Sequence, residues 1–426
     1  MARREIQVDE KLPLLQTLPL SFQHLFAMFG STVLVPIIFE VNPATILLFN
    51  GIGTLLYLFL CKGRIPAYLG SSFAFLAPVL LVLGKYDYSA ALGGFIAVGF
   101  IFTAVALIVQ AVGTKWIDVV FPPAAMGAIV AVIGLELAPV AAQMAGLAAA
   151  DATIKYVPDP KVITVSMFTL GVTVLGSVVF RGFLAIIPIL IGIISGYVLS
   201  IFMGLVSLAP IAEAKWIAMP TLYTPSFNLN AIMIIIPAAL VVIAEHVGHL
   251  FVTSNIVGRD LAKDPGLHRS LLGNGLSTLF SGFFGSTPNT TYGENIGVLA
   301  ITKVYSVWVI GGAAVLAIIL SFVGKLAAAI QSIPTPVMGG VSLLLFGIIA
   351  ASGIRMLVEA KVDYSKASNL ILTSVVLIIG VSGAQIQLGA VSLKGMGLAT
   401  VVAILLSILF RVLENLKLNN ETDGNP

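Results

Sequence analysis

Long apolar runs, separated by short charged or turn-forming segments, recur along almost the whole chain. One helix crossing a bilayer needs about 20 predominantly apolar residues. The apolar runs fall at 18–39, 43–61, 66–84, 89–113, 120–138, 162–180, 183–206, 229–256, 269–285, 288–303, 304–325, 334–357, 366–383 and 394–413. Hydrophobic residues make up 58% of the chain and charged residues 10%, whereas soluble domains have about 45–50% and about 25%. The sequence therefore predicts an all-α polytopic membrane protein with fourteen transmembrane segments.

The charge and cysteine content exclude several classes of protein. The net charge of +3 is small and gives no indication of binding to nucleic acid. Cys61 is the one cysteine, so we expect neither an intramolecular disulfide nor a cysteine-based metal site, and no cofactor. The first sixteen residues are charged and lack an apolar stretch followed by small residues, so they do not resemble a signal peptide.

The distribution of basic residues predicts the orientation of the chain. With fourteen spans and a cytoplasmic N-terminus, sixteen of the 22 Lys and Arg fall on the inside and six on the outside. Basic residues are enriched in cytoplasmic loops. We therefore expect both termini to be cytoplasmic.

The two halves of the sequence resemble each other. Pro122, Met126 and Gly127 align with Pro334, Met338 and Gly339 at an offset of 212, and Gly70-Ser71 aligns with Gly285-Ser286 at 215. Because seven spans per half is an odd number, the second half must be inverted. Inverted repeats with interrupted segments at matching positions are typical of secondary transporters.

A polar, glycine- and threonine-rich segment at 281–303 interrupts this apolar pattern. It carries Asn289, Glu294 and Asn295. An acid at the centre of a membrane helix costs about 2.5 kcal/mol or more. The segment must therefore line something polar, and we expect that to be a small, hydrogen-bonding solute in transit.

The eighth apolar run contains three ionisable residues, Glu245, His246 and His249. Glu245 and His249 are four residues apart and share a helix face, while His246 points about 100° away. A buried carboxylate is too costly to be retained without a use. For the histidines, a role in hydrogen-bonded packing is the alternative, and for His246 the two interpretations stay open.

The two interrupted segments supply further candidates. Gly293 precedes Glu294 and permits close approach of a ligand to the backbone. Phe73 follows Gly70-Ser71-Ser72 and is a candidate for stacking on a planar ligand, or else an ordinary packing residue. Gln23 and His24 are expected to support neighbouring polar groups, and Glu136 is expected to reach the surface.

The stretch Glu294-Asn295-Ile296-Gly297, followed by Thr302-Lys303, resembles the signature of the nucleobase–ascorbate transporter family. Segments such as IPAYLGSSFAF and VVIAEHVGHL extend the resemblance along nearly the whole chain. Relatives that transport purines more often have Gln where this chain has Glu294, so the site resembles the uracil branch.

The resemblance implies an architecture. We expect a 7+7 inverted repeat with short antiparallel strands in segments 3 and 10, and a homodimer surrounded by membrane lipid. A core domain would comprise residues 1–118 and 226–330, and a gate domain residues 119–225 and 331–426.

The resemblance also implies roles for individual residues. Those expected to bind the substrate are Ser31, Phe73, Glu245, Tyr292, Gly293 and Glu294. Glu245, His249 and Glu294 would take part in proton coupling. Ser31 stands where relatives have Ala, and Phe346 stands where they have Tyr.

The expected function is proton-coupled uptake of uracil across a bacterial cytoplasmic membrane by alternating access, not enzymatic catalysis. Transport of another nucleobase such as xanthine, or of an anion by the same architecture, is the alternative. An intramembrane zinc hydrolase does not fit, because zinc motifs of the H-E-x-x-H type enclose the Glu between two His at i and i+4. Here Glu245 lies outside the pair His246 and His249.

Overall fold

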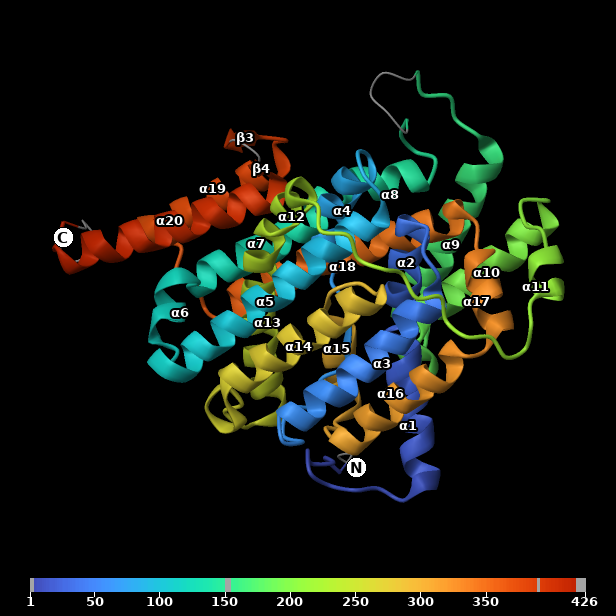
Figure 1. The fold of residues 1–426 in the computed structure, drawn as a ribbon, viewed down its shortest axis with the longest axis horizontal. Coiled ribbons are helices and arrows are strands. Elements are labelled where there is room, and N and C mark those ends of the chain that lie inside the picture. Colours follow the sequence, from blue (N-terminus) through green and yellow to red (C-terminus); the bar gives the residue numbers. More distant parts are fainter. Residues whose placement is uncertain (1–3, 150–154, 389–390, 419–426) are drawn as a thin grey trace.

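A computed structural model describes residues 4–149, 155–388 and 391–418. The two chain ends, predicted to be cytoplasmic, lie at residues 1–3 and 419–426, outside the described part. Helices dominate the fold, and they pack around one another with the ends of α19 and α20 projecting to one side (Figure 1).

The first half of the chain contains one interrupted segment, formed by β1, η1 and α4, and the long helix α5. Its elements are α1 (Leu14–Ala27), α2 (Phe29–Phe39), α3 (Pro43–Leu60), β1 (Leu69–Ser71), η1 (Phe73–Phe75), α4 (Leu76–Leu83), α5 (Tyr88–Val112), α6 (Lys115–Val120), α7 (Pro123–Glu136), α8 (Ala138–Met144), α9 (Pro160–Val179), η2 (Leu184–Ile186), α10 (Pro188–Phe202) and α11 (Ala209–Glu213).

The second half repeats the pattern of long helices and one interrupted segment, and adds a hairpin. Its elements are α12 (Leu229–Ile235), α13 (Pro237–Val257), η3 (Ala262–Gly266), α14 (Leu267–Phe284), β2 (Asn289–Thr291), α15 (Gly293–Thr302), α16 (Val307–Ser321), α17 (Gly324–Gln331), α18 (Thr335–Glu359), α19 (Ala367–Val381), β3 (Gln385–Leu388), β4 (Val391–Lys394) and α20 (Gly395–Asn415).

Helical structure occupies each of the fourteen predicted apolar ranges. Within the described residues, eight helices or helix pairs are long and apolar enough to cross a membrane, and four apolar helices are shorter. The polytopic, mostly helical fold is therefore confirmed, while the count of fourteen spans stays a prediction.

The interrupted segments 3 and 10 contain the short strands that were predicted. β1 and β2 pair antiparallel, with Leu69 opposite Thr291 and Ser71 opposite Asn289. Each strand leads directly into helical structure. β1 is followed by η1 and α4, and β2 is followed by α15. The two interrupted segments, one from each half of the chain, therefore meet at the strand pair.

The side chain of Asn289 fixes β2 inside the helix bundle. Its Nδ2 donates to the carbonyl of Phe49 at 3.1 Å and to the hydroxyls of Ser277 at 2.8 Å and Ser281 at 3.2 Å. Buried polar groups require such partners, because an unpaired one keeps its full desolvation cost. The polar residues on α14 thus allow a non-helical segment to exist in an apolar interior.

The hairpin β3–β4 was not predicted. Its strands pair antiparallel with Gln385 opposite Lys394. Each strand has only four residues, too few to distinguish a strand from the end of an apolar helix by periodicity.

One end of the molecule gathers segments that were predicted to lie on the inside. Arg64 pairs with Asp264, Arg259 Nη2 lies 3.0 Å from Asp9 Oδ1, and Lys303 Nζ lies 2.8 Å from Glu5 Oε1. The pKa of Asp9 is below its usual value of 3.8, because a backbone N–H and then Arg259 favour the carboxylate. The last two pairs join the N-terminal segment to the ends of α13 and α15, and the first joins the end of α3 to η3.

The opposite end gathers segments that were predicted to lie on the outside. The loop between α10 and α12 contacts three other outer segments there. The backbone N–H of Asn42 donates to Tyr223 Oη at 2.9 Å, that of Ser226 to the carbonyl of Ser89 at 2.9 Å, and that of Gly324 to the carbonyl of Trp216 at 3.0 Å. The described loops thus contact one another in two groups, while the side of the membrane on which each group lies stays a prediction.

The helices pack in two sets. α14 packs on α5 and α3, and α16 packs on α3 and α1. Separately, α18 packs on α7 and α9, while α19 and α20 pack on each other and on α7. Close helix contact in the second set depends on glycine: a Cβ on Gly134 of α7 would lie 2.2 Å from the carbonyl oxygen of Phe346 on α18.

Candidate functional site

Helix α13 carries the three ionisable residues Glu245, His246 and His249 at the centre of the molecule. It begins at Pro237, a residue favoured in the first turn of a helix because it has no N–H to leave unpaired. Glu245 is 9% exposed and His246 is 1% exposed. α13 thus presents an acid and a histidine to a nearly dry interior.

The starts of η1 and α15 face the same region from the two strands. Ser72 caps η1, accepting a hydrogen bond from the N–H of Ala74 at 3.4 Å, and Phe73 follows it. Glu294 lies in the first turn of α15, directly after Gly293. The first N–H groups of a helix lack partners within that helix and carry partial positive charge. Such ends suit carbonyl acceptors and carboxylates.

Two hydroxyl groups hold the two acids. Ser31 Oγ on α2 donates to Glu294 Oε1 at 2.5 Å, and Ser72 Oγ donates to Glu245 Oε2 at 3.4 Å. Glu245 and Glu294 are close enough to interact electrostatically. The structure therefore brings together, from α2, η1, α13 and α15, the residues Ser31, Glu245 and Glu294 that lie far apart in the sequence.

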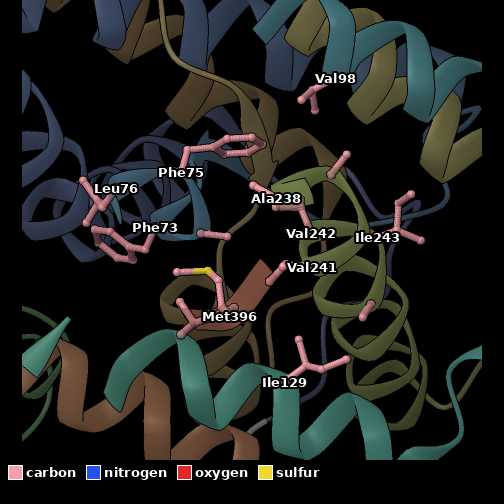
Figure 2. Close-up of a cluster of buried hydrophobic side chains, with 14 of the residues drawn as sticks. Phe73, Phe75, Leu76, Val98, Ile129, Ala238, Val241, Val242, Ile243 and Met396 are labelled. Carbon is pink, nitrogen blue, oxygen red and sulfur yellow. The ribbon is translucent and has the colours of Figure 1, made fainter. Parts of the chain in front are cut away.

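Phe73 lies on the apolar side of this region. Its ring meets that of Phe346 on α18 edge to face, with centroids 5.9 Å apart and planes at 80°. Phe73 lies near Met396 of α20 and on the side of α13 that carries Val241 (Figure 2). Phe346, which replaces the expected Tyr, therefore contacts a residue that was predicted to bind the substrate.

Gly293 and His249 face each other. A Cβ on Gly293 would lie 3.5 Å from Nε2 of His249. Both residues line a cavity of about 90 Å³ that Arg355 and Glu359 of α18 also line. Arg355 Nε lies 2.6 Å from Glu359 Oε1, so an ion pair borders this cavity on the predicted inner side.

Tyr292 is 4% exposed and packs against the other strand. A Cβ on Gly70 would lie 2.2 Å from the Tyr292 ring, so only glycine fits at this position of β1. The ring of Tyr292 thus lies on the strand pair that supports the site.

Two expectations about supporting residues have clear outcomes. His24 does support a polar group: Asn295 Nδ2 donates to its carbonyl at 3.0 Å and lies 3.2 Å from its Nδ1. Glu136, expected at the surface, is instead half-buried, and its Oε2 accepts from the N–H of Met396 at 2.9 Å. Glu136 thus provides a hydrogen-bond acceptor for a backbone N–H at the start of α20. No pattern in the sequence indicates this contact.

Residues around the histidines were missed by the sequence reasoning. Thr291 Oγ1 lies 3.1 Å from His249 Nδ1, and Ser270 Oγ lies 2.7 Å from His246 Nε2. Both come from other elements, β2 and α14, and serine and threonine are too common for their positions to be informative. Among the residues that the structure describes, no group of three or more His, Cys, Asp or Glu could hold a metal ion.

A larger cavity of about 400 Å³ lies on the predicted outer side. It is lined by the ends of α4 and α7 and the starts of α13 and α20, including Pro78, Glu136, Ala238 and Met396. Its volume is within the range of about 300–1,000 Å³ found for small-molecule sites. None of the residues predicted to bind the substrate is among the residues that line this cavity.

A bundle of membrane helices with two interrupted segments, whose helix starts face a pair of buried acids, defines a secondary transporter. A family model described as a permease family matches residues 15–389. The chain belongs to this family, which confirms the resemblance found in the sequence.

Curated relatives agree with this assignment, and one solved structure shares the fold. The chain is 70% identical to the uracil permease of Escherichia coli (strain K12), over 98% of this chain and 96% of that protein. It is 67% identical to the uracil permease of Paenibacillus larvae, over 99% and 100%. The transmembrane domain of the cyanobacterial bicarbonate transporter BicA has the same fold, with a TM-score of 0.60 at 13% identity, over 96% of this chain and 99% of that chain.

Proposed function

We propose that this protein carries uracil together with a proton across a bacterial cytoplasmic membrane, by alternating access. The observation that carries the proposal is the convergence of Glu245 and Glu294, each held by a serine hydroxyl, on the starts of two interrupted helices. The identity of 70% to a uracil permease over nearly the full chain supports the choice of solute.

The chemistry of the base fits the proposed site. Uracil is planar and neutral, with two N–H donors and two carbonyl acceptors. The carboxylates of Glu245 and Glu294 accept from the N–H groups of the base, and backbone N–H groups in the first turn of α15 donate to its carbonyls. Phe73 offers a ring for stacking, and Gly293 allows the base to approach the backbone. Ser31 and Tyr292 complete this proposed binding set.

Proton coupling follows from the same acids. Two carboxylates that share one desolvated region do not both remain ionised, because each opposes the charge of the other. We propose that Glu245, Glu294 and His249 bind and release the coupled proton. Coupling requires that the base and the proton favour the same state of the protein.

The packing of the helices supports a division into two moving parts. We propose a core of residues 1–118 and 226–330 and a gate of residues 119–225 and 331–426, corresponding to the two sets of packed helices. The cavity of about 90 Å³ beside His249 is smaller than the volumes of about 300–1,000 Å³ found for small-molecule sites. A base therefore enters or leaves when the gate helix α18 moves relative to α13 and α15. We also propose that the protein is a homodimer embedded in lipid.

An anion carrier is the second candidate, since BicA shares the fold. Helix N-termini attract anions, but a pair of buried carboxylates repels them. The acid pair therefore favours a neutral solute with N–H donors.

The test uses the protein reconstituted into proteoliposomes, with labelled uracil outside. Uptake should rise as the external pH falls and should collapse when a protonophore is added. Unlabelled xanthine, thymine and bicarbonate serve as competitors and should displace uracil less well than uracil itself. Uptake that follows a sodium gradient and ignores the proton gradient would contradict the proposal.

A further inference from the structure

Two histidines of α13 share one hydroxyl group, although they lie on different helix faces. Thr291 Oγ1 of β2 lies 3.1 Å from Nδ1 of His249 and 3.4 Å from Nδ1 of His246. Thr291 is 4% exposed and His246 is 1% exposed, so these contacts lie in the dry interior. The Thr291 hydroxyl therefore connects His249, which is proposed for proton coupling, with His246. None of the hydrogen bonds described above joins His246 to Glu245 or Glu294.

The partners of His246 fix which of its nitrogens carries the proton. Asn274 Nδ2 is a donor and lies 2.8 Å from His246 Nδ1, so Nδ1 accepts. In a neutral imidazole the proton then resides on Nε2, which donates to Ser270 Oγ at 2.7 Å. Ser270 in turn shares a hydrogen bond of 2.6 Å with the hydroxyl of Tyr57. The assignment of the ring proton thus rests on an amide donor on one side and a hydroxyl chain on the other.

The same logic determines the direction of the hydrogen bond at Thr291. Because His246 Nδ1 carries no proton, only the Thr291 hydroxyl can be the donor in the 3.4 Å contact, which is the longer of the two contacts that share the Nδ1 lone pair, the other being that of Asn274. The oxygen of Thr291 is then free to accept from Nδ1–H of His249. Neutral His249 is thereby held with its proton on Nδ1 and with Nε2 as the basic nitrogen. Nε2 is also the atom that faces Gly293 and the first turn of α15.

We propose that Thr291 is a positioning residue for proton coupling, resting on the proposed function: its hydroxyl, oriented by His246, holds His249 in the tautomer whose Nε2 faces Gly293 and the cavity. His249 is then ready to take a proton on Nε2 without rotating its ring. A proton bound on Nε2 lies next to α15, the helix that carries Glu294. The Nδ1–H group of His249 keeps the Thr291 hydroxyl as its acceptor whether or not Nε2 is protonated.

The surroundings of the two histidines contain other titratable and charged groups. They come from α3, α13, α15 and α18, and comprise Tyr57, Cys61, Glu245, Glu294, Arg355 and Glu359. Each of these groups is unchanged by a substitution at Thr291. An altered pH dependence in a Thr291 variant therefore reports the loss of the hydroxyl and not the removal of a charge.

The experiment replaces Thr291 by Val, which keeps the branched shape and the preference for a strand but lacks the hydroxyl. Uracil binding at equilibrium should stay within about threefold of the parent protein, because Thr291 is not among the groups proposed to contact the base. Proton-driven accumulation of uracil should fall by about tenfold, the effect of one lost hydrogen bond of about 1.4 kcal/mol. The pH at which uptake is half-maximal should shift, and Thr291→Ser, which restores a hydroxyl, should recover most of both properties.

Controls separate this role from a loss of stability. Thr173→Val removes another buried hydroxyl, one that donates to the backbone carbonyl of Thr169 in α9, and should leave the pH profile unchanged. Nitrogen-15 spectra of protein labelled at its four histidines report the tautomers directly. In Thr291→Val, the His249 signals should change from a protonated Nδ1 to a mixture of tautomers, while the His246 signals change less.

Two results would overturn the proposal. One is a Thr291→Val protein with the parent pH profile and accumulation, and the other is a His249 tautomer with its proton on Nε2 in the parent protein. Failure of the parent protein to take up uracil with protons would instead contradict the proposed function. The parent tautomer can still be measured in that case, so the two failures are distinguishable.

Discussion

Glu245 and Glu294, the two acids proposed to bind the base, have different hydrogen-bond partners. Ser31 donates to Glu294 at 2.5 Å, whereas Ser72 donates to Glu245 at 3.4 Å and also accepts from a backbone N–H. Ser31 stands where relatives of this family were expected to have alanine. The hydroxyl therefore adds a partner to Glu294, and the orientation of that acid depends on α2 as well as on α15.

Removal of either acid should abolish tight binding of uracil. We expect Glu245→Ala and Glu294→Ala each to weaken binding by about 5- to 150-fold, since an N–H of the base that has left water would lose its acceptor at a cost of about 1–3 kcal/mol. Calorimetric titration of the purified variants with uracil measures this. Glu213→Ala, at an exposed position of α11, is the matched control and should bind normally. Normal affinity in either variant would remove that residue from the site.

His249 should affect coupling more than binding. It lies one helical turn from Glu245, about 6 Å along the axis, and faces Gly293. We expect His249→Ala to lose most proton-driven accumulation of uracil while retaining part of the equilibrium binding. His246→Ala, which acts through Thr291, should be milder in both assays. A more severe defect in His246→Ala than in His249→Ala would show that the inward face of α13 is wrongly assigned.

Among the elements, the strand pair depends on close packing between α3, α14 and β2. A Cβ on Gly53 of α3 would lie 2.1 Å from Ser277 Oγ and 2.5 Å from Asn289 Nδ2, the groups that hold β2. The interrupted segment is therefore positioned by a glycine of α3 that is not itself among the residues predicted to bind the substrate.

Substitution of Gly53 by Ala tests this dependence. We expect Gly53→Ala to destabilise the protein by about 1–3 kcal/mol, because the added methyl group overpacks a buried hydrogen-bonded contact. The midpoint of thermal unfolding in detergent, with and without uracil, measures the effect. Gly171→Ala in α9, where a Cβ would meet no atom within 4 Å, carries the same change and should be neutral or stabilising. Equal midpoints for the two variants would contradict the packing argument.

For the whole molecule, the proposed motion requires contacts between core and gate to open. A Cβ on Gly397 of α20 would lie 3.2 Å from Cβ of Pro237 at the start of α13. This separation is close to the Cβ–Cβ distance of about 3.5–4.5 Å in disulfides. Pro237 belongs to the proposed core and Gly397 to the proposed gate.

A disulfide between these positions should block transport reversibly. We expect Pro237→Cys/Gly397→Cys to lose uracil uptake after oxidation and to regain it with a reductant, because the gate can no longer move away from the core. Each single variant, treated in the same way, is the control, and the native Cys61 is buried. Full uptake by the oxidised, cross-linked protein would exclude relative motion at this contact.

The sequence by itself determined the class of protein, the two interrupted segments, and the candidate acids Glu245 in the eighth apolar run and Glu294 in the tenth. Apolar runs of span length and a polar segment among them have few physical solutions in lipid, where every backbone polar group must find a partner. Prediction from the sequence was less reliable where it depended on how elements from distant parts of the chain are placed relative to one another. The alignment of Gly70-Ser71 with Gly285-Ser286 placed the repeat five residues off, since Gly70 lies in β1 whereas Gly285 ends α14 before β2 begins.

Only the tertiary structure decided how the candidate residues are held. The hydroxyls of Ser31 and Thr291 bind Glu294 and His249 from elements 263 and 42 residues away in the chain. The half-buried Glu136 binds a backbone N–H 260 residues away. Hydrogen bonds of this kind depend on distances of a few tenths of an ångström between elements, and neither periodicity nor composition carries that information. The types of residue in the candidate site can thus be identified from the sequence, while the geometry of the site arises from the packing of the two halves.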